Sequence, residues 1–380
     1  MSWREASAMS LRRELVTLAL GDGANIRQVC RHFAVSPKTG YKWIGRWLEG
    51  GVVALQDRSR RPHHSPRRTA PHLERAVLDV RDAYPTWCGR KIRDRLLAIG
   101  MAHPPSASTI TEILRRHGRL DPGHSRPSRA WQRFEAPAPN ALWQMDFKGH
   151  FPLSYSGRCH PLTVLDDHSR FALGLRACPN ERGSTVQEQL IGIFRRYGLP
   201  DRILVDNGSP WGSDAEHVYT PLTAWLIRLG IGVAHSAPYH PQTLGKDERF
   251  HRTVKAEAIG TRIFRDLDEC QRRFDQWRDI YNFERPHDSL GRAVPGNRYQ
   301  LSRQSFPETL PSIEYGPQDV VRKVQANGEI YFRQHAFQVG KPFRGQPVGL
   351  RPTTSDGVWD VHFCHQKVAT IHLTAASAET

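Results

Sequence analysis

The hydrophobic pattern of the chain changes near residue 141, and this change limits the possible folds more than any other feature. Before it, apolar residues recur at helical spacing. From 141 to 258 the order becomes three strands, a helix, a strand, a helix, a strand and a helix. The short apolar run at 202–205, which stops at Asp206, is typical of a buried parallel strand. The pattern predicts an α/β domain, a mixed sheet flanked by helices.

Residues 10–50 are predicted to form three short helices, and Ser36-Pro37 supplies the N-cap and first residue of the third. Its spacing predicts that Tyr41, Ile44 and Leu48 are buried. The layout is that of a helix-turn-helix, whose second helix enters the DNA major groove; the alternative is a small helical bundle with a solvated basic face. The residues expected to contact DNA from this helix are Lys38, Thr39, Lys42 and Arg46.

The remaining segments follow from composition and periodicity. Arg58, Arg60 and Arg61 lie in a polar linker rich in Arg, Pro and His that is predicted to track phosphates, or else to act as a solvated tether. The expected order is a helix-turn-helix domain (1–56), a basic linker (57–70), a second helix-turn-helix domain (71–120), a linker (121–136), the α/β core (137–262), a helical extension (263–300) and a small β-barrel-like domain (316–375).

The formal net charge of +16 favours a polyanionic partner, with nucleic acid ahead of an anionic membrane. The longest apolar run near the start, residues 15–20, is too short for a signal peptide or a membrane span. The six cysteines are scattered singly, and no His/Cys spacing suggests a zinc site. These features predict a cytoplasmic, nucleoid-associated protein that binds double-stranded DNA and no membrane.

Three acidic residues fall where the predicted elements could bring them together. Asp146 lies within a strand, Asp206 ends another strand, and Glu248 begins a later helix. Strand C-termini and helix N-termini converge on one edge of an α/β sheet, where carboxylates bind hard divalent cations. Each acid also has an ordinary explanation: Asp206 can belong to a turn, and Glu248 can pair with Arg252 one helical turn on.

Five pieces of sequence stand in one order: LWQMDFKG (142–149), TVLDDHSR (163–170), LVDNGSPW (204–211), PYHPQTLGKDERFHRTVK (238–255) and YNFERPHDSL (281–290). With these pieces and the paired helix-turn-helix front end, the chain resembles the DDE transposases of bacterial insertion sequences. Those enzymes carry a catalytic core of the retroviral-integrase type, which has a ribonuclease H-like fold. The interval between Asp206 and Glu248 is longer than usual for the superfamily, and a polar insert at 211–220 explains the excess.

The resemblance implies that Asp146, Asp206 and Glu248 are the catalytic, metal-binding residues, with Mg²⁺ or Mn²⁺ as cofactor. It implies metal-dependent cleavage at the terminal inverted repeats and strand transfer into target DNA, by a homodimer or larger assembly. The residues implied to line that DNA are Lys246, Arg249, Arg252 and Lys255. Asp247 is expected to be exposed, and Asp166 and Asp167 to lie in a hairpin turn.

Two other functions remain open. A repressor derived from a transposase would bind DNA without cutting it. A ribonuclease H-like nuclease would act on RNA–DNA hybrids, although helix-turn-helix domains favour duplex DNA, because the deep, narrow groove of A-form helices does not admit a helix.

Overall fold

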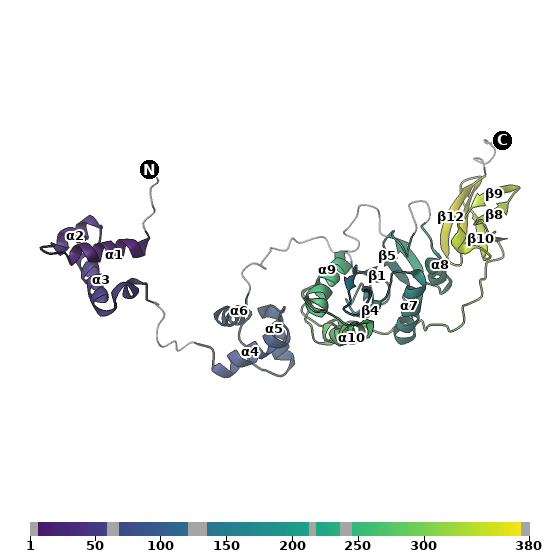
Figure 1. The fold of residues 1–380 in the computed structure, drawn as a ribbon. Coiled ribbons are helices and arrows are strands. Elements are labelled where there is room, and N and C mark those ends of the chain that lie inside the picture. The colour runs from purple at the N-terminus through teal and green to yellow at the C-terminus, as the bar shows by residue number, and fades with distance from the viewer. Residues whose placement is uncertain (1–6, 59–67, 121–134, 213–217, 236–244, 374–380) are drawn as a thin grey trace, which may run out of the picture. The chain divides into compact units, whose positions relative to one another are not determined.

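The computed structural model describes residues 7–58, 68–120, 135–212, 218–235 and 245–373. The chain divides into two compact units, Met1–Arg68 and Thr69–Thr380 (Figure 1). Within the described residues, no helix is long and apolar enough to cross a membrane.

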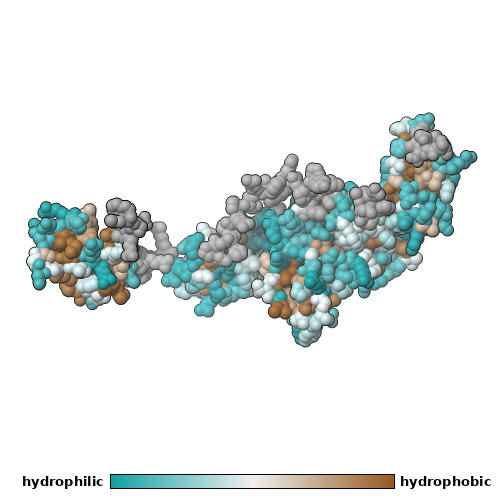
Figure 2. Space-filling model, turned by 45° about the horizontal axis from the view of Figure 1, so that its top comes forward, coloured by the Kyte–Doolittle hydropathy of each residue, from teal (hydrophilic) through white to brown (hydrophobic). Residues whose placement is uncertain are grey.

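The first unit consists of α1 (Ala8–Ala19), α2 (Ile26–His32), α3 (Pro37–Gly50) and the short 3-10 helix η1 (Gly51–Leu55). The side chain of Ser36 caps α3 by accepting a hydrogen bond from the Thr39 amide at 3.2 Å. The predicted buried stripe of α3 is wrong at two positions, because Tyr41 is 56% exposed and Leu48 is 70% exposed. The helix packs instead through Trp43, Ile44 and Gly40, where an added Cβ would collide with the Cys30 sulfur. Hydrophobic residues therefore reach the surface of this unit (Figure 2).

Three further helices, α4 (Pro71–Ala83), α5 (Gly89–Ala98) and α6 (Ala107–Arg116), begin the second unit around their own apolar core. Gly89 permits close packing of α5 on α6, because an added Cβ would lie 2.5 Å from the Ala107 carbonyl oxygen. The group is tied to the end of α10 (Leu267–Phe283) at Glu284, which accepts a hydrogen bond from the Tyr84 hydroxyl at 2.5 Å and pairs with Arg95 at 2.7 Å.

The centre of the second unit is a mixed sheet. Its strands are β1 (Trp143–Phe147), β2 (Phe151–Pro152), β3 (Arg158–Asp166), β4 (Ala172–Cys178), β5 (Arg202–Val205) and β6 (Gly232–His235). Strands β4, β3 and β1 are antiparallel neighbours, and β5 and β6 continue the sheet parallel to β1. Helices α7 (Gly183–Tyr197) and α8 (Pro221–Arg228) follow β4 and β5. The predicted alternation of strands and helices is confirmed.

Two apolar clusters flank this sheet. One joins β1 and β5 to α7 and α8. The other joins β3 and β4 to α10 and α9 (Gly245–Val254), which continues into the five-residue π-helix η4 (Lys255–Ile259). The Asp266 side chain caps α10 by accepting a hydrogen bond from the Glu269 amide at 2.8 Å. Helices on both faces leave the strand ends as the accessible edge of the sheet.

Beyond two 3-10 turns, η5 (Asp288–Leu290) and η6 (Pro295–Asn297), the chain ends in a small β domain. Its strands are β7 (Val320–Lys323), β8 (Glu329–Phe332), β9 (His335–Gln338), β10 (Pro347–Pro352), β11 (Val358–Phe363) and β12 (Gln366–His372), and η7 (Lys341–Phe343) lies between β9 and β10. The described strands form a four-stranded antiparallel sheet and a two-stranded hairpin, not a closed barrel. The multidomain α/β fold class is confirmed, with an open sheet in place of the barrel-like domain.

Candidate active site

The strand register brings Asp146 and Asp206 together. Gln144 of β1 pairs with Leu204 of β5 in parallel, so Asp146, two residues further along β1, lies level with Asp206, the residue directly after β5. Neighbouring strands are about 4.8 Å apart, which is within reach of two carboxylates that share a cation. The edge of the sheet therefore presents two acidic side chains side by side.

The electrostatics of the pair are unfavourable without a cation. Burial, followed by the charge of Asp206, raises the pKa of Asp146 to about 6, although the Phe147 amide donates to its Oδ1 at 2.7 Å. Burial also raises the pKa of Asp206, whose Oδ1 accepts from the Gly208 amide at 3.1 Å. The negative charge of Glu181 raises both pKa values further, so a third acid lies near the pair.

His251 of α9 lies beside Asp146. Its Nδ1 is 3.9 Å from Asp146 Oδ2, and its Nε2 is 2.8 Å from the hydroxyl of Thr163. That hydroxyl donates to the Asp146 carbonyl oxygen, so Nε2 carries a hydrogen and donates to Thr163. Burial lowers the pKa of His251 to about 4, and the imidazole is neutral at pH 7. Sequence reasoning missed this residue, because only the packing of α9 against β1 reveals it.

The first turn of α9 differs from the expectation. Asp247 is 1% exposed, so the prediction that it lies on the surface is wrong. Its carboxylate oxygens have no hydrogen-bond partner among the described residues, and burial, followed by the charge of Asp146, raises its pKa well above the usual range. Glu248, in contrast, has a 74% exposed side chain that lies 4.0 Å from Arg252. In this structure α9 thus turns Asp247, rather than Glu248, toward the sheet.

The Lys246 side chain is also directed into the protein. Its ammonium donates to Asp167 Oδ1 at 2.5 Å, and only 19% of the side chain is exposed. Burial lowers its pKa. Asp167 and its neighbour Asp166 are themselves fully buried, in the turn that joins β3 to β4. This contact fastens the start of α9 to the turn, and the expected DNA contact of Lys246 stays a prediction.

The other residues expected to contact DNA divide by exposure. Arg249, Arg252 and Lys255 are exposed on the outer side of α9 and η4. On α3, Lys38 is exposed, Thr39 shares a hydrogen bond with Ser36 at 3.0 Å, and Lys42 and Arg46 both lie 4.9 Å from the Trp43 ring centre. Arg58 is exposed, whereas Arg60 and Arg61 lie outside the described residues.

Family models match the chain in five places. An integrase core domain matches residues 136–241 and a second integrase core model matches 229–295. The C-terminal domain of IS481 family transposases matches 319–379. A helix-turn-helix domain matches 11–63, and a homeodomain-like domain matches 39–114. These matches follow the order of the helical units, the sheet and the small β domain.

Two curated relatives come from insertion elements. The chain is 29% identical over 157 residues to the "Insertion element IS476 uncharacterized 39.2 kDa protein" of Xanthomonas euvesicatoria, covering 41% of this chain and 43% of that protein. It is 27% identical over 158 residues to the "Insertion element IS407 uncharacterized 31.7 kDa protein" of Burkholderia multivorans, covering 42% and 54%. The chain thus spans about half the length of these relatives.

Among solved structures, a simian T-cell lymphotropic virus intasome in complex with PP2A regulatory subunit B56 gamma gives a TM-score of 0.37 at 15% identity, covering 77% of this chain and 99% of that chain. The HTLV-2 integrase catalytic core domain in complex with magnesium gives 0.33 at 14% identity, covering 43% and 99%. These low structural scores carry no argument. The domain matches and the insertion-element relatives support a transposase that joins N-terminal helix-turn-helix domains to an integrase-type core.

Proposed function

We propose that the chain is a DDE transposase that cuts DNA at the ends of its element and joins those ends to target DNA, with Mg²⁺ or Mn²⁺ as cofactor. The observation that carries this proposal is the register of β1 and β5, which sets Asp146 and Asp206 level on adjacent parallel strands. The donor set is composed of carboxylate oxygens, the ligands that hard divalent cations prefer. The raised pKa values mean that the carboxylate charges are unfavourable at this edge, and a bound cation would neutralise them.

In this proposal Asp146 and Asp206 hold the cation at the sheet edge. Bound divalent cations supply charge neutralisation at the attacking and leaving oxygens of an in-line displacement at phosphorus. The neutral imidazole of His251 fixes Thr163, which in turn hydrogen-bonds the backbone of Asp146. Catalysis would rest on position and charge, so no nucleophilic Ser or Tyr is needed.

Glu248 is the third ligand in this proposal, following the sequence resemblance. Its side chain is open to solvent, and its 4.0 Å pair with Arg252 is worth only about 0.3–0.5 kcal/mol, so this pair does not hold it away from a cation. Asp247 is the competing candidate, because it is the acid of α9 that is buried beside Asp146. The two residues are adjacent in sequence, which makes them a matched pair for mutation.

The deciding experiment is a cleavage and strand-transfer assay on the flanking DNA of the element, with Mg²⁺ and with chelator. We expect Glu248→Gln to abolish both reactions and Asp247→Asn to retain them, with end binding unchanged in both variants. Loss of activity in Asp247→Asn alone would move the third ligand to Asp247. Tight end binding without metal-dependent cutting by the wild type would favour the repressor function.

DNA recognition is proposed for three parts of the chain. The two helix-turn-helix regions support binding of duplex DNA, and the proposed substrate for them is the terminal repeat. The exposed cations Arg249, Arg252 and Lys255 would hold phosphates beside the active site. Joining two element ends requires at least two active sites, so the proposed working form is a homodimer or larger assembly on DNA.

A further inference from the structure

The strand register gathers a second group of metal-ligating side chains outside the proposed catalytic pair. Phe151 of β2 pairs with Cys159 of β3, so the preceding residue, His150, comes opposite His160. On its other side His160 pairs with Cys178, the last residue of β4, and Glu181 follows in the connection to α7. Side chains from the residue before β2, from β3 and from the segment after β4 thus meet around His160.

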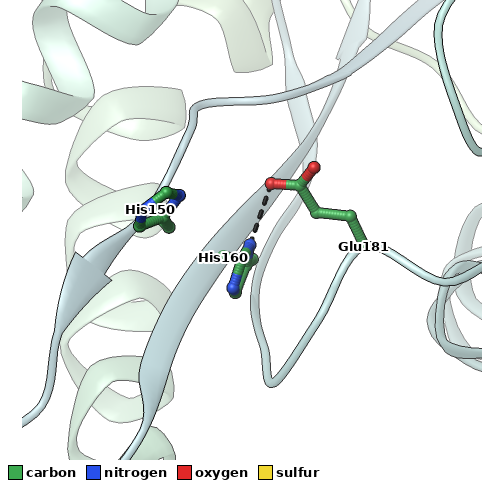
Figure 3. A group of neighbouring side chains, drawn as sticks. All are labelled: His150, His160 and Glu181. Atoms are coloured by element: carbon green, nitrogen blue, oxygen red, sulfur yellow. Dashed lines mark hydrogen bonds and ion pairs between the residues drawn. The ribbon is translucent and has the colours of Figure 1, made fainter.

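The side chains face one another (Figure 3). His150, His160 and Glu181 each offer one ligand atom, and these atoms lie within 4.8 Å of one another. His160 Nδ1 is 2.8 Å from Glu181 Oε1, and the two imidazole ring centres are 5.1 Å apart. His160 is partly buried, with 18% of its side chain exposed, whereas Glu181 is 38% exposed and therefore able to move.

We propose that His150, His160 and Glu181 form a binding site for a divalent transition-metal ion of the Zn²⁺ class. Its ligands differ from Asp146 and Asp206, although Glu181 lies near that pair. Two imidazoles and one carboxylate are a usual ligand set for such ions, and they leave a coordination position open for water. Mg²⁺ prefers oxygen ligands alone and does not compete well for imidazole nitrogen.

The geometry requires only a small adjustment. Two ligands, each about 2.1 Å from a tetrahedral Zn²⁺, are about 3.4 Å apart. The 2.8 Å pair of His160 and Glu181 must open slightly, as the ion takes the place of the hydrogen between them. Arg158 now contacts His150 Nε2 and is itself exposed, so it can swing into solvent when the ion enters.

Calorimetric titration of the full chain with Zn²⁺, without DNA and in excess Mg²⁺, tests the site. The Mg²⁺ saturates oxygen ligands, so the readout is independent of the proposed transposition activity. We expect His160→Ala and Glu181→Gln to weaken one binding event by at least about 100-fold, since loss of an outer-shell partner alone costs 10–100-fold. His160→Ala changes a partly buried strand residue and could disturb folding. Glu181→Gln keeps the size of the side chain and lies in a connecting segment, so its effect on Zn²⁺ binding tests the site independently of folding.

Two matched variants complete the test. His103→Gln, which alters an exposed histidine far along the chain, should leave that binding event unchanged. Arg158→Ala should tighten it roughly fivefold, because it removes a positive charge next to the ion. Identical titrations for wild type, His160→Ala and Glu181→Gln would overturn the proposal. Loss of the wild-type signal in excess Mg²⁺ would also overturn it, since that would indicate an oxygen-ligand site.

Discussion

Two pairs of aspartates in the same sheet illustrate opposite ways of holding negative charge. In the turn after β3, Asp166 accepts from the Asn140 amide and from the amide and hydroxyl of Ser169, at 2.6–2.7 Å. Asp167 beside it accepts from the Ala136 amide, Gln144 and Lys246. Both are fully buried.

At the ends of β1 and β5, the second pair has fewer donors. From the described residues, the side chains of Asp146 and Asp206 each accept one backbone hydrogen bond, and each is only partly buried. The fold supplies several donors to the first pair, although burial still raises the pKa of Asp166, whereas the second pair has few donors, which suits the cation proposed there. Burial alone therefore does not identify a functional acid; the distinguishing feature is the number of protein donors.

The largest expected effect is on catalysis by the strand-end pair. Asp146→Asn should reduce cleavage at least about 1000-fold, since it removes a ligand that the protein cannot replace. The same change should leave the metal-free protein equally stable or raise its free energy of unfolding by up to about 3 kcal/mol, because Asn places no negative charge in this position, where burial and then the charge of Asp206 raise the pKa of Asp146. Cleavage assays and urea denaturation of one preparation measure both. A strongly destabilised Asp146→Asn would make this aspartate structural.

The turn pair should respond in the opposite way. Asp167→Asn leaves the Lys246 ammonium without its buried partner, and breaking such a pair costs about 3–5 kcal/mol. Urea denaturation at pH 7 gives the free energy of unfolding directly. A loss below about 1 kcal/mol would contradict the distinction between the two pairs.

A smaller change tests the neighbouring acid of the turn. Ser169→Ala removes the hydroxyl that donates to Asp166 Oδ1 at 2.6 Å. It keeps the hydrogen bond from the backbone amide of residue 169 to the same oxygen. Hydrogen bonds to charged groups contribute about 1.5–3 kcal/mol, and we expect a loss in that range. Thermal denaturation measures the loss. The control is Ser10→Ala, which removes an exposed hydroxyl that shares a hydrogen bond only with the Ser7 hydroxyl among the contacts of its side chain in the described residues.

Much of this could be predicted from the sequence, because strand and helix periodicities are local. The run at 202–205 matches β5, and Asp146 and Asp206 lie on the strands predicted for them. The buried face of α9 could also have been predicted from its spacing. Phe250 and Val254 lie four residues apart and are both buried, and stepping back three residues from Phe250 reaches Asp247 on the same face.

What the sequence could not supply was contact between distant segments. Asp167 and Lys246 are far apart in the chain, and only the packing of α9 beside β1 joins them. The group of His150, His160 and Glu181 has no recognisable spacing, because it depends on the register of β2 with β3 and on the exit from β4. On α3, Gly40 lies close to Cys30 of α2, and Trp43 is buried where Tyr41 was expected to be.

The smallest effect separates the two pairs by pH. The folded pKa of Asp146, about 6, lies above its ordinary value of 3.8, so the folded protein holds this proton more tightly than the unfolded chain. Its contribution to the stability of the metal-free protein is therefore present at low pH and is lost as the pH rises through about 6. Metal binding needs the ionised form, so Mg²⁺ affinity should fall about tenfold, or about 1.4 kcal/mol, for each pH unit below that value.

Calorimetric titration with Mg²⁺ from pH 5 to pH 7, on wild type and on Ser169→Ala, measures this slope. The two proteins should give the same slope, because Ser169 donates to the turn pair alone; a change in Ser169→Ala would mean that the turn acids also bind the cation.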